Sequence, residues 1–506
     1  MSIVRLNVLA SFASNVWTAL VAVILIPLYV ALLGIEAWGV IGIFVSLQTI
    51  CTVLDLGLSA TMNREMARLS AQTDMTQEMH DLVRTLELIY WGIALVIGIS
   101  VFTIAPVIAN HWVEAHQLSP ETIKNAIRMM GLALSLQWPF VLYSGGLLGL
   151  QQQVLLGGIN IAVVTLRGAG AILILWKVSP TLQAFFFWQI VIGLLQTCLA
   201  GWFLRYSLPH TSSNPSFRIE MLRSRWRFAA GISGITVMAV ILLQMDKVIL
   251  SRLLTLEMFG YYVLASSVAT GLYLLVGPVF SALYPKFTQL VSLGDEQELR
   301  KLYHRSCQLM SVVLLPIAMI IVFFSKEILL LWTGSPATVQ HSHSILSLLV
   351  LGTTPNGLMH LPFAVQIAYG WTKLSFYINL AAVLVLGPSI VLLTSLYGAV
   401  GAALLWVIFN SALALIGIQL MHRRLLKGEQ WGWYLDDVGL PLAVSLATAL
   451  FCLIIVPTGG SRIQSLIVLS SISLFVMTST FIATPVTRAA LLGYFRSRKL
   501  RFFDLR

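Results

Sequence analysis

The sequence predicts an all-α, polytopic membrane protein with about fourteen transmembrane helices. Of the 506 residues, 58% are hydrophobic and only 10% are charged, whereas soluble domains carry about 25% charged residues. The mean hydropathy is +0.88, and apolar runs long enough to cross a bilayer recur from end to end. These observations exclude a small soluble domain and a disordered chain.

The apolar runs define the expected spans, and short turns such as "GIEAWG" and "SLYGAVG" join many of them. The first run, "VLASFASNVWTALVAVILIPLYVALLG", is too long for the apolar part of a signal peptide, so we expect it to be a membrane helix. The fourteen spans are expected at 8–33, 37–61, 84–108, 123–148, 154–176, 182–204, 228–253, 258–284, 305–325, 343–368, 374–396, 398–420, 438–456 and 464–486.

The distribution of basic residues predicts the orientation. With a cytoplasmic amino terminus, most of the 31 Lys and Arg residues fall at cytoplasmic ends of spans, including the tail "RSRKLRFFDLR". By the positive-inside rule, both termini are expected to be cytoplasmic. The net charge of +11 is therefore explained by topology, and nucleic acid is not an expected partner. Contact of the basic tail with anionic membrane lipid is an alternative.

The chain contains an internal repeat, seen as three matches in the same order at a separation of about 220 residues. The matches are "LLGIEAWG" (32–39) with "LLTLEMFG" (253–260), Trp112 with Trp332, and "QVLLGGIN" (153–160) with "TKLSFYIN" (372–379). Such a repeat predicts two six-helix lobes in the same orientation, with a ligand site between them.

The repeat also predicts the domain organisation. The expected divisions are a first lobe at 1–210, a cytoplasmic linker at 211–227, a second lobe at 228–425, and two additional helices with a basic tail at 426–506.

Asp246 and Lys247 lie inside the seventh span, in "LLQMDKVILSRLL". Ionisable residues within a span are candidates for a functional site. Adjacent residues on a helix point about 100° apart, so we do not expect these two side chains to face each other. Lys247 is a candidate cation of a cavity, or it extends outward to the membrane surface. Asp246 is a candidate for charge balance or ion coupling, or it belongs to a structural ion pair.

Arg167 lies near the middle of the fifth span, in "VTLRGAGAIL". An arginine at this depth costs roughly 2.5–3.5 kcal/mol on insertion scales. Its planar set of donors suits a phosphate or a carboxylate, so we expect it to bind substrate. The alternative is a fixed pair with an acidic residue such as Asp55 or Asp246. Gly168 and Gly170 would let neighbouring helices approach or leave room beside the guanidinium.

A third set of charges occurs in "LLDLGLSATMNREMARLSA". Asp55 lies about two turns inside the second span and is a candidate for charge balance or ion coupling. Arg64 and Arg68 share one helix face near its cytoplasmic end, where Arg64 is a candidate contact for an anionic head group. Ordinary positive-inside anchoring explains the same arginines.

The sequence lacks the signatures of several other functions. It has no Walker A motif, no zinc-protease motif and no long loop for a catalytic domain, so we expect neither an enzyme nor a cofactor. The four cysteines lie singly in apolar runs and are expected to pack without disulfides. Asp436 and Asp437, in "WYLDDVGLP", are expected on a solvated face at the entrance of a span.

Two long segments resemble a known family. "YVALLGIEAWGVIGIFVSLQTICTVLDLGLSATMNREMARLSA" is similar to the amino-terminal signature of bacterial polysaccharide-transport proteins of the O-antigen flippase type. "MDKVILSRLLTLEMFGYYVLASSVATGLYLLVGPVFSALYPKFTQLVSLGDEQELRKLYHRSCQLM" is similar to the start of their second half. The resemblance is strong through about residue 335 and weakens after it. The family belongs to the multidrug/oligosaccharidyl-lipid/polysaccharide exporter superfamily.

The resemblance implies a function and partners. It implies two six-helix lobes, alternating access, and transfer of an undecaprenyl-pyrophosphate-linked glycan across the bacterial cytoplasmic membrane. A polysaccharide polymerase and a chain-length regulator would be its protein partners. Arg167 and Lys247 would then bind pyrophosphate or acidic sugars. A multidrug–cation antiporter of the same superfamily is the second candidate, and an integral-membrane glycan polymerase or ligase is the third.

Overall fold

The computed structural model describes residues 3–72, 75–211, 213–456 and 461–488. Within these ranges every regular element is helical, apart from an isolated bridge between Glu114 and Thr255. The all-α prediction is therefore confirmed. The four cysteines carry free thiols.

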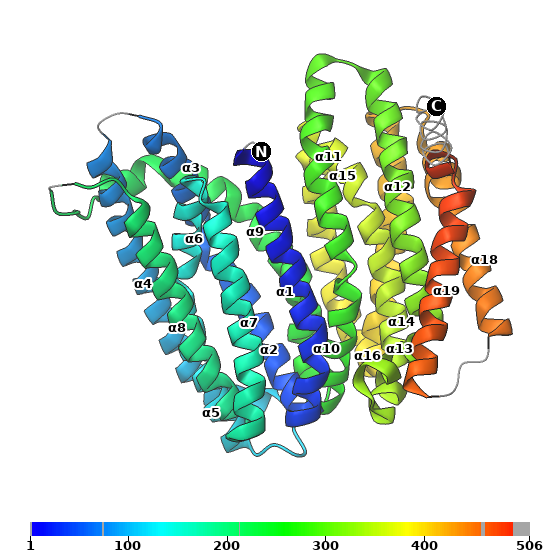
Figure 1. Cartoon of the computed structure of the whole chain (residues 1–506), viewed down its shortest axis with the longest axis horizontal. Coiled ribbons are helices and arrows are strands. Elements are labelled where there is room, and N and C mark those ends of the chain that lie inside the picture. Colours follow the sequence, from blue (N-terminus) through cyan, green and yellow to red (C-terminus); the bar gives the residue numbers. More distant parts are fainter. Residues whose placement is uncertain (1–2, 73–74, 212, 457–460, 489–506) are drawn as a thin grey trace, which may run out of the picture. The chain divides into compact units, whose positions relative to one another are not determined.

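The chain divides into two compact units, and Figure 1 labels their helices. The first unit comprises residues 1–263 and 378–391, and the second comprises 264–377 and 392–506. This grouping places most of the predicted linker and the seventh span with the first unit. The lobe boundaries expected from the repeat remain a prediction.

In the first unit, long helices lie side by side in an antiparallel bundle, and short helices follow the breaks between them (Figure 1). The strongest packing joins α5 with α8, α1 with α7, and α4 with α5. The elements are α1 (Ile3–Leu33), α2 (Ile35–Cys51), η1 (Thr52–Asp55), α3 (Leu58–Ser70), α4 (Thr76–Val107), η2 (Ile108–Trp112), α5 (Pro120–Gln137), α6 (Phe140–Gly149), α7 (Gln153–Lys177), α8 (Leu182–Ser207) and α9 (Ile219–Leu253).

In the second unit, α12 is the central helix, because it packs against α14, α18 and α19. Two elements, α10 and α16, contribute residues to both units. The elements are α10 (Leu256–Thr270), α11 (Tyr273–Leu293), α12 (Glu296–Phe323), α13 (Ser325–Thr333), α14 (Pro336–Leu358), α15 (His360–Ala368), α16 (Thr372–Arg424), α17 (Gln430–Gly432), η3 (Trp433–Gly439), α18 (Leu440–Ile455) and α19 (Arg462–Ala483).

Eleven described helical stretches are long and apolar enough to cross a membrane. In three parts of the predicted topology, a predicted span does not correspond to one of these eleven stretches. The expected span 123–148 lies on α5 and α6, and the span 228–253 lies on α9. The spans 374–396 and 398–420 both lie on α16, where Gly398 (φ 60°, ψ −146°) interrupts the helix. The count of fourteen remains a prediction.

The second predicted span is not one helix, which corrects the expectation for 37–61. Helix α2 tightens into the 3₁₀ turn η1, and the chain then passes through Leu56 (φ 48°) and Gly57 (φ 71°) before α3 begins. Both residues are left-handed, a conformation that ends helices and is unusual for leucine. Asp55 therefore lies at a break in the helix and not in its interior.

The two copies of the repeat also share a helix break and an N-terminal cap. In both copies the fourth span is two helices, divided at Pro139 between α5 and α6, and at Met359 between α14 and α15. Each of these spans begins with the same N-terminal cap. The Ser119 and Ser335 hydroxyls accept hydrogen bonds from the N–H groups of Thr122 and Thr338, each at 3.2 Å, and a proline follows each serine.

Candidate functional site

Arg167 points into a group of glutamine side chains within the first unit. Its Nη2 donates to Oε1 of Gln196 on α8 at 2.7 Å. With its amide oriented to satisfy both of its atoms, Gln137 at the end of α5 accepts from Nη1 at 3.2 Å and from Nη2 at 3.3 Å. Gln48 of α2 also contacts Gln137. The guanidinium is therefore solvated by neutral amides from two helices, α5 and α8.

No acidic side chain among the described residues lies within ion-pair distance of Arg167. Its buried Nε also lacks a hydrogen-bond partner there. The fixed pair with Asp55 or Asp246, the alternative considered from the sequence, is not observed. The positive charge of Arg167 is thus stabilised by dipoles and has no counter-ion in the described protein.

The two glycines beside Arg167 serve helix packing. A Cβ on Gly168 would lie 2.1 Å from Cδ1 of Leu25, and a Cβ on Gly170 would lie 2.3 Å from the ring of Trp188. The Tyr29 hydroxyl donates to the carbonyl of Gly168 at 3.2 Å. Side chains of α1 and α8 occupy the space that the glycines leave, so α7 is held close to both helices.

Asp246 and Lys247 contact each other, which corrects the expectation that they do not face one another. Lys247 Nζ lies 3.5 Å from Asp246 Oδ1, and the Tyr262 hydroxyl donates to Asp246 Oδ2 at 2.8 Å. Lys247 Nζ also donates to the carbonyl of Leu243 at 3.3 Å. Because Leu243 precedes it on α9, the lysine curls back along the helix and does not extend toward the end at Leu253.

Asp55 makes local contacts at the break after α2. It accepts from the backbone N–H of Ser59 at 3.2 Å and from the Ser59 hydroxyl at 2.8 Å. The Tyr90 hydroxyl of α4 donates to the same carboxylate. The aspartate therefore binds the first turn of α3, where a helix N-terminus favours negative charge.

The two arginines of α3 are both exposed. Arg68 forms an ion pair with Glu65 at 2.8 Å. Arg167, the Asp246–Lys247 pair and Asp55 share no hydrogen-bond partner among the described residues. The described hydrogen bonds therefore do not link Arg167, Asp55 and the Asp246–Lys247 pair to one another, and the grouping of the five candidates in one site remains a prediction.

Two buried glutamates were missed in the sequence. Glu87 of α4 accepts from the Tyr143 hydroxyl at 2.5 Å and forms ion pairs with Arg205 and Arg84. Glu36 of α2 is 2% exposed and accepts three backbone N–H groups, at 2.8 to 2.9 Å, from residues 116–118. Glu87 lies within the expected span 84–108, so the criterion that identified Arg167 would have found it. Glu36 lies in the turn "GIEAWG" between two expected spans, where that criterion gives no signal.

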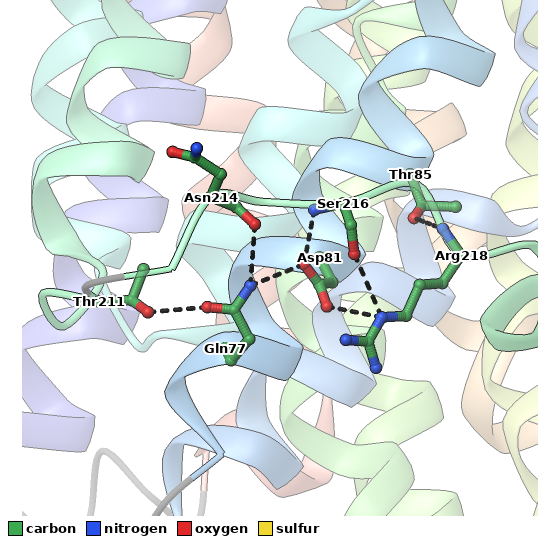
Figure 2. A network of polar contacts seen from close by, with 7 residues as sticks. All are labelled: Gln77, Asp81, Thr85, Thr211, Asn214, Ser216 and Arg218. Atoms are coloured by element: carbon green, nitrogen blue, oxygen red, sulfur yellow. Dashed lines mark hydrogen bonds and ion pairs between the residues drawn. The ribbon is translucent and has the colours of Figure 1, made fainter.

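A third missed residue, Asp81 of α4, holds residues 213–218 against α4 (Figure 2). It is fully buried and accepts from the Ser216 N–H at 2.7 Å and from the Gln77 amide at 3.0 Å. It also forms an ion pair with Arg218 at 2.8 Å. The segment that follows α8 is therefore bound to α4 through these contacts.

Asp437 is buried, which corrects its predicted place on a solvated face. It lies in the π-helical segment η3 and is 1% exposed. Its Oδ2 lies 2.5 Å from Nδ1 of His304 on α12. Asp436, its neighbour, is exposed. The π-helical turn rotates Asp437 inward, and helix periodicity in the sequence does not reveal such a turn.

Comparison with known proteins gives one family and one fold. The sequence model of the family described as "Polysaccharide biosynthesis protein" matches residues 28–336. A Shigella flexneri protein named "Putative O-antigen transporter" is 22% identical over 382 residues, which is 74% of this chain and 87% of that protein.

Two solved structures have the same fold. The lipid II flippase MurJ in its inward closed conformation has a TM-score of 0.66 at 14% identity, covering 94% of this chain and 99% of that one. An inward-facing multidrug resistance MATE family transporter of the MOP superfamily has a TM-score of 0.65 at 13% identity, covering 84% and 98%. These TM-scores establish a common fold. Sequence identities this low do not identify the substrate.

Proposed function

The chain belongs to the polysaccharide biosynthesis protein family, and on that premise we propose that it is a flippase for a lipid-linked oligosaccharide. Its substrate would be an undecaprenyl-pyrophosphate-linked repeat unit of O-antigen or another surface polysaccharide. It would carry this unit across the bacterial cytoplasmic membrane by alternating access, with both termini in the cytoplasm. The protein is a multi-pass membrane transporter and not an enzyme.

The relatives support a lipid-linked substrate. The Shigella flexneri relative is named as an O-antigen transporter, and one structural neighbour is a flippase for lipid II. The other neighbour is a multidrug transporter, so the fold alone does not choose between these substrates. A polymerase and a chain-length regulator remain proposed partners.

The observation that carries the proposal is the environment of Arg167. A buried guanidinium with no acidic partner in the described protein, held by Gln196 and Gln137, retains a full positive charge. A phosphate or carboxylate is the natural ligand for such a group. We assign Arg167 to the anionic part of the substrate, with Lys247 and Arg64 as further candidate contacts. Asp55 and Asp246 would balance charge or take part in ion coupling.

A multidrug–cation antiporter is the second candidate, because one neighbour with this fold has that description. An unpaired arginine disfavours it, since a cationic drug would be repelled by Arg167 in the low dielectric of the membrane. An anionic pyrophosphate would be attracted by the same charge.

The proposal is tested by deleting the gene in its host. Loss of surface polysaccharide, with the lipid-linked unit accumulating on the inner face of the cytoplasmic membrane, is expected. Restoration by the wild-type gene is the control. Unchanged surface polysaccharide together with increased sensitivity to cationic drugs would instead identify a multidrug exporter.

A further inference from the structure

His304 lies between two carboxylates within the second unit. Its Nδ1 is 2.5 Å from Asp437 Oδ2, and its Nε2 is 3.2 Å from Glu429 Oε2. Glu429 directly precedes α17, and Asp437 lies in η3, so both acidic residues belong to the short segment 429–439 between α16 and α18. The imidazole thus joins this segment to α12.

The two contacts require one proton more than a neutral histidine carries. A neutral imidazole has one N–H donor and one acceptor nitrogen, whereas a carboxylate has only acceptor oxygens. With a neutral ring and two carboxylates, one of the two contacts would place lone pairs against each other. Both contacts are satisfied when an additional proton is bound by the cluster, with the imidazolium as its simplest form.

The surrounding charges favour binding of this proton. In the described second unit, no Lys or Arg lies within ion-pair distance of Asp437, and its buried Oδ1 has no hydrogen-bond partner. Arg300 contacts Glu429 at 3.0 Å and Glu296 at 3.5 Å. An imidazolium supplies the counter-charge for the buried Asp437, whereas loss of the proton leaves that buried charge uncompensated.

The other titratable or charged groups near the cluster come from three elements. They are Tyr303 and Cys307 on α12, His422 on α16, and Tyr434 and Asp436 on η3. Among them, His422 is the other histidine. Its Nδ1 contacts the Ile418 carbonyl at 3.0 Å, and its buried Nε2 has no partner in the described chain. A neutral His422 ring fits that environment. We therefore assign the additional proton to the cluster of His304, Asp437 and Glu429.

We propose that His304, Asp437 and Glu429 form a proton-binding site whose occupancy fastens the segment 429–439 to α12 during the transport cycle. The imidazole takes the proton from hydronium, so that an O–H bond breaks as an N–H bond forms, and the reverse step returns the proton to water. When it leaves, one of the two contacts must break. Glu429, with 28% of its side chain exposed, is free to separate, while Asp437, with 1%, is not.

One further observation fits this site. A Cβ on Gly432 would lie only 3.3 Å from Cε1 of His304, so the backbone of the segment passes close to the ring. The link to transport rests on the proposed function, whereas binding of the proton does not.

The first experiment measures proton binding in the purified full-length protein. The protonated cluster makes both contacts, so its contribution to stability is present at acidic pH and is lost as the pH rises. We expect the midpoint of thermal unfolding of the wild type to fall across about pH 5–8, the range in which histidines titrate. In His304→Gln this pH-dependent fall should be reduced, because the amide cannot take up a proton.

The matched control is His343→Gln, because His343 contacts the carbonyl of Val339 and the hydroxyl of Ser344 instead of a carboxylate. This control should keep the wild-type pH dependence. An identical pH dependence in wild type and His304→Gln would overturn the proton-binding site. If His304→Gln is not recovered folded, Glu429→Gln, at a partly exposed position, serves in its place and should reduce the same fall.

The second experiment separates this inference from the proposed function. In the deletion strain, His304→Gln and Asp437→Asn at normal membrane abundance should leave surface polysaccharide at the deletion level. A deletion that does not change the polysaccharide would contradict the proposed function and leave the in-vitro result standing. A deletion that abolishes it, with full restoration by both variants, would show that the proton is not used in transport.

Discussion

Gly39 and Gly260 lie at equivalent positions of the repeated motif, and each packs against the backbone of the other copy. A Cβ on Gly39 would lie 2.6 Å from the carbonyl oxygen of Leu256, and a Cβ on Gly260 would lie 2.3 Å from that of Ile35. Ile35 and Leu256 are themselves equivalent in "LLGIEAWG" and "LLTLEMFG". The contact is therefore reciprocal. The glycine that ends both copies of the motif is the residue at which the two motifs pack against each other.

Substitution of either glycine by alanine should destabilise the protein. A methyl group at 2.6 Å or less from a carbonyl oxygen forces the helices apart, a change of the kind that costs about 1–3 kcal/mol. We expect lower membrane abundance and a lower unfolding temperature for Gly39→Ala and Gly260→Ala. Gly92→Ala on α4, where a Cβ meets nothing within 4 Å, is the control. Equal behaviour of all three variants would refute the close approach.

Replacing Glu36 by glutamine should loosen the segment that follows η2. One carboxylate oxygen becomes an NH₂ group, which cannot accept from the backbone N–H groups of residues 116–118. A buried donor without a partner costs about 1–3 kcal/mol, so the segment should be cleaved faster by added protease. The equivalent change in the repeat, Glu257→Gln, removes only a 3.5 Å contact with Tyr261 and should have little effect.

Arg167→Gln should keep the protein abundant and abolish transport. The environment of the side chain is neutral, so the amide can replace the guanidinium without leaving a buried anion. Arg167→Lys should also be impaired, because an ammonium does not reproduce the planar set of donors. Membrane abundance and surface polysaccharide are measured together. Lys177→Gln, at the end of the same helix, is the control, and normal polysaccharide in Arg167→Gln would remove this residue from the substrate site.

Asp246→Asn should lower membrane abundance by leaving Lys247 without its counter-charge. The pair is partly exposed, with 25% and 18% of the two side chains accessible, so the cost should be below the ~3–5 kcal/mol of a fully buried pair. The double variant Asp246→Asn with Lys247→Met should recover abundance. Its surface polysaccharide then reports whether transport needs the charges. Normal abundance and polysaccharide in the single variant would exclude both roles of Asp246.

Asp81→Asn should release residues 213–218 from α4. The change weakens the ion pair with Arg218 and places an NH₂ group among the donors that converge on this side chain (Figure 2). Trypsin should then cut after Arg218 several-fold faster than in the wild type. Asp295→Asn, which alters the N-terminal cap of α12, is the comparison. An unchanged cleavage rate at Arg218 would show that Asp81 does not hold the segment.

The fold class could be predicted because hydropathy and length determine which segments can enter a membrane. The fourth span, 123–148, shows the limit of this approach. Its end was predicted within a residue of Gly149, yet the structure divides this span at Pro139 into α5 and α6. The left-handed pair Leu56 and Gly57 could not be predicted, because leucine rarely adopts this conformation and the sequence carries no signal for it.

The candidate site could be predicted residue by residue but not as an arrangement. Arg167 was identified by the cost of placing its charge in lipid, whereas its partners Gln137 and Gln196 come from other helices. Asp437 was misplaced because the π-helical turn of η3 changes the face on which it lies. Contacts between helices and local changes of helix type are set by tertiary packing, which a single sequence does not display.

Gly398 has a practical consequence for mapping the topology of this chain. It is the one residue with non-helical backbone angles inside α16, which otherwise runs from Thr372 to Arg424. The helix is interrupted there, and a Cβ on Gly398 would meet nothing within 4 Å. An epitope tag inserted at this point therefore does not have to shift the register of a continuous helix, in which each added residue contributes about 1.5 Å and 100°. Gly370 and Gly428, which also combine a positive φ with open space, are comparable insertion points.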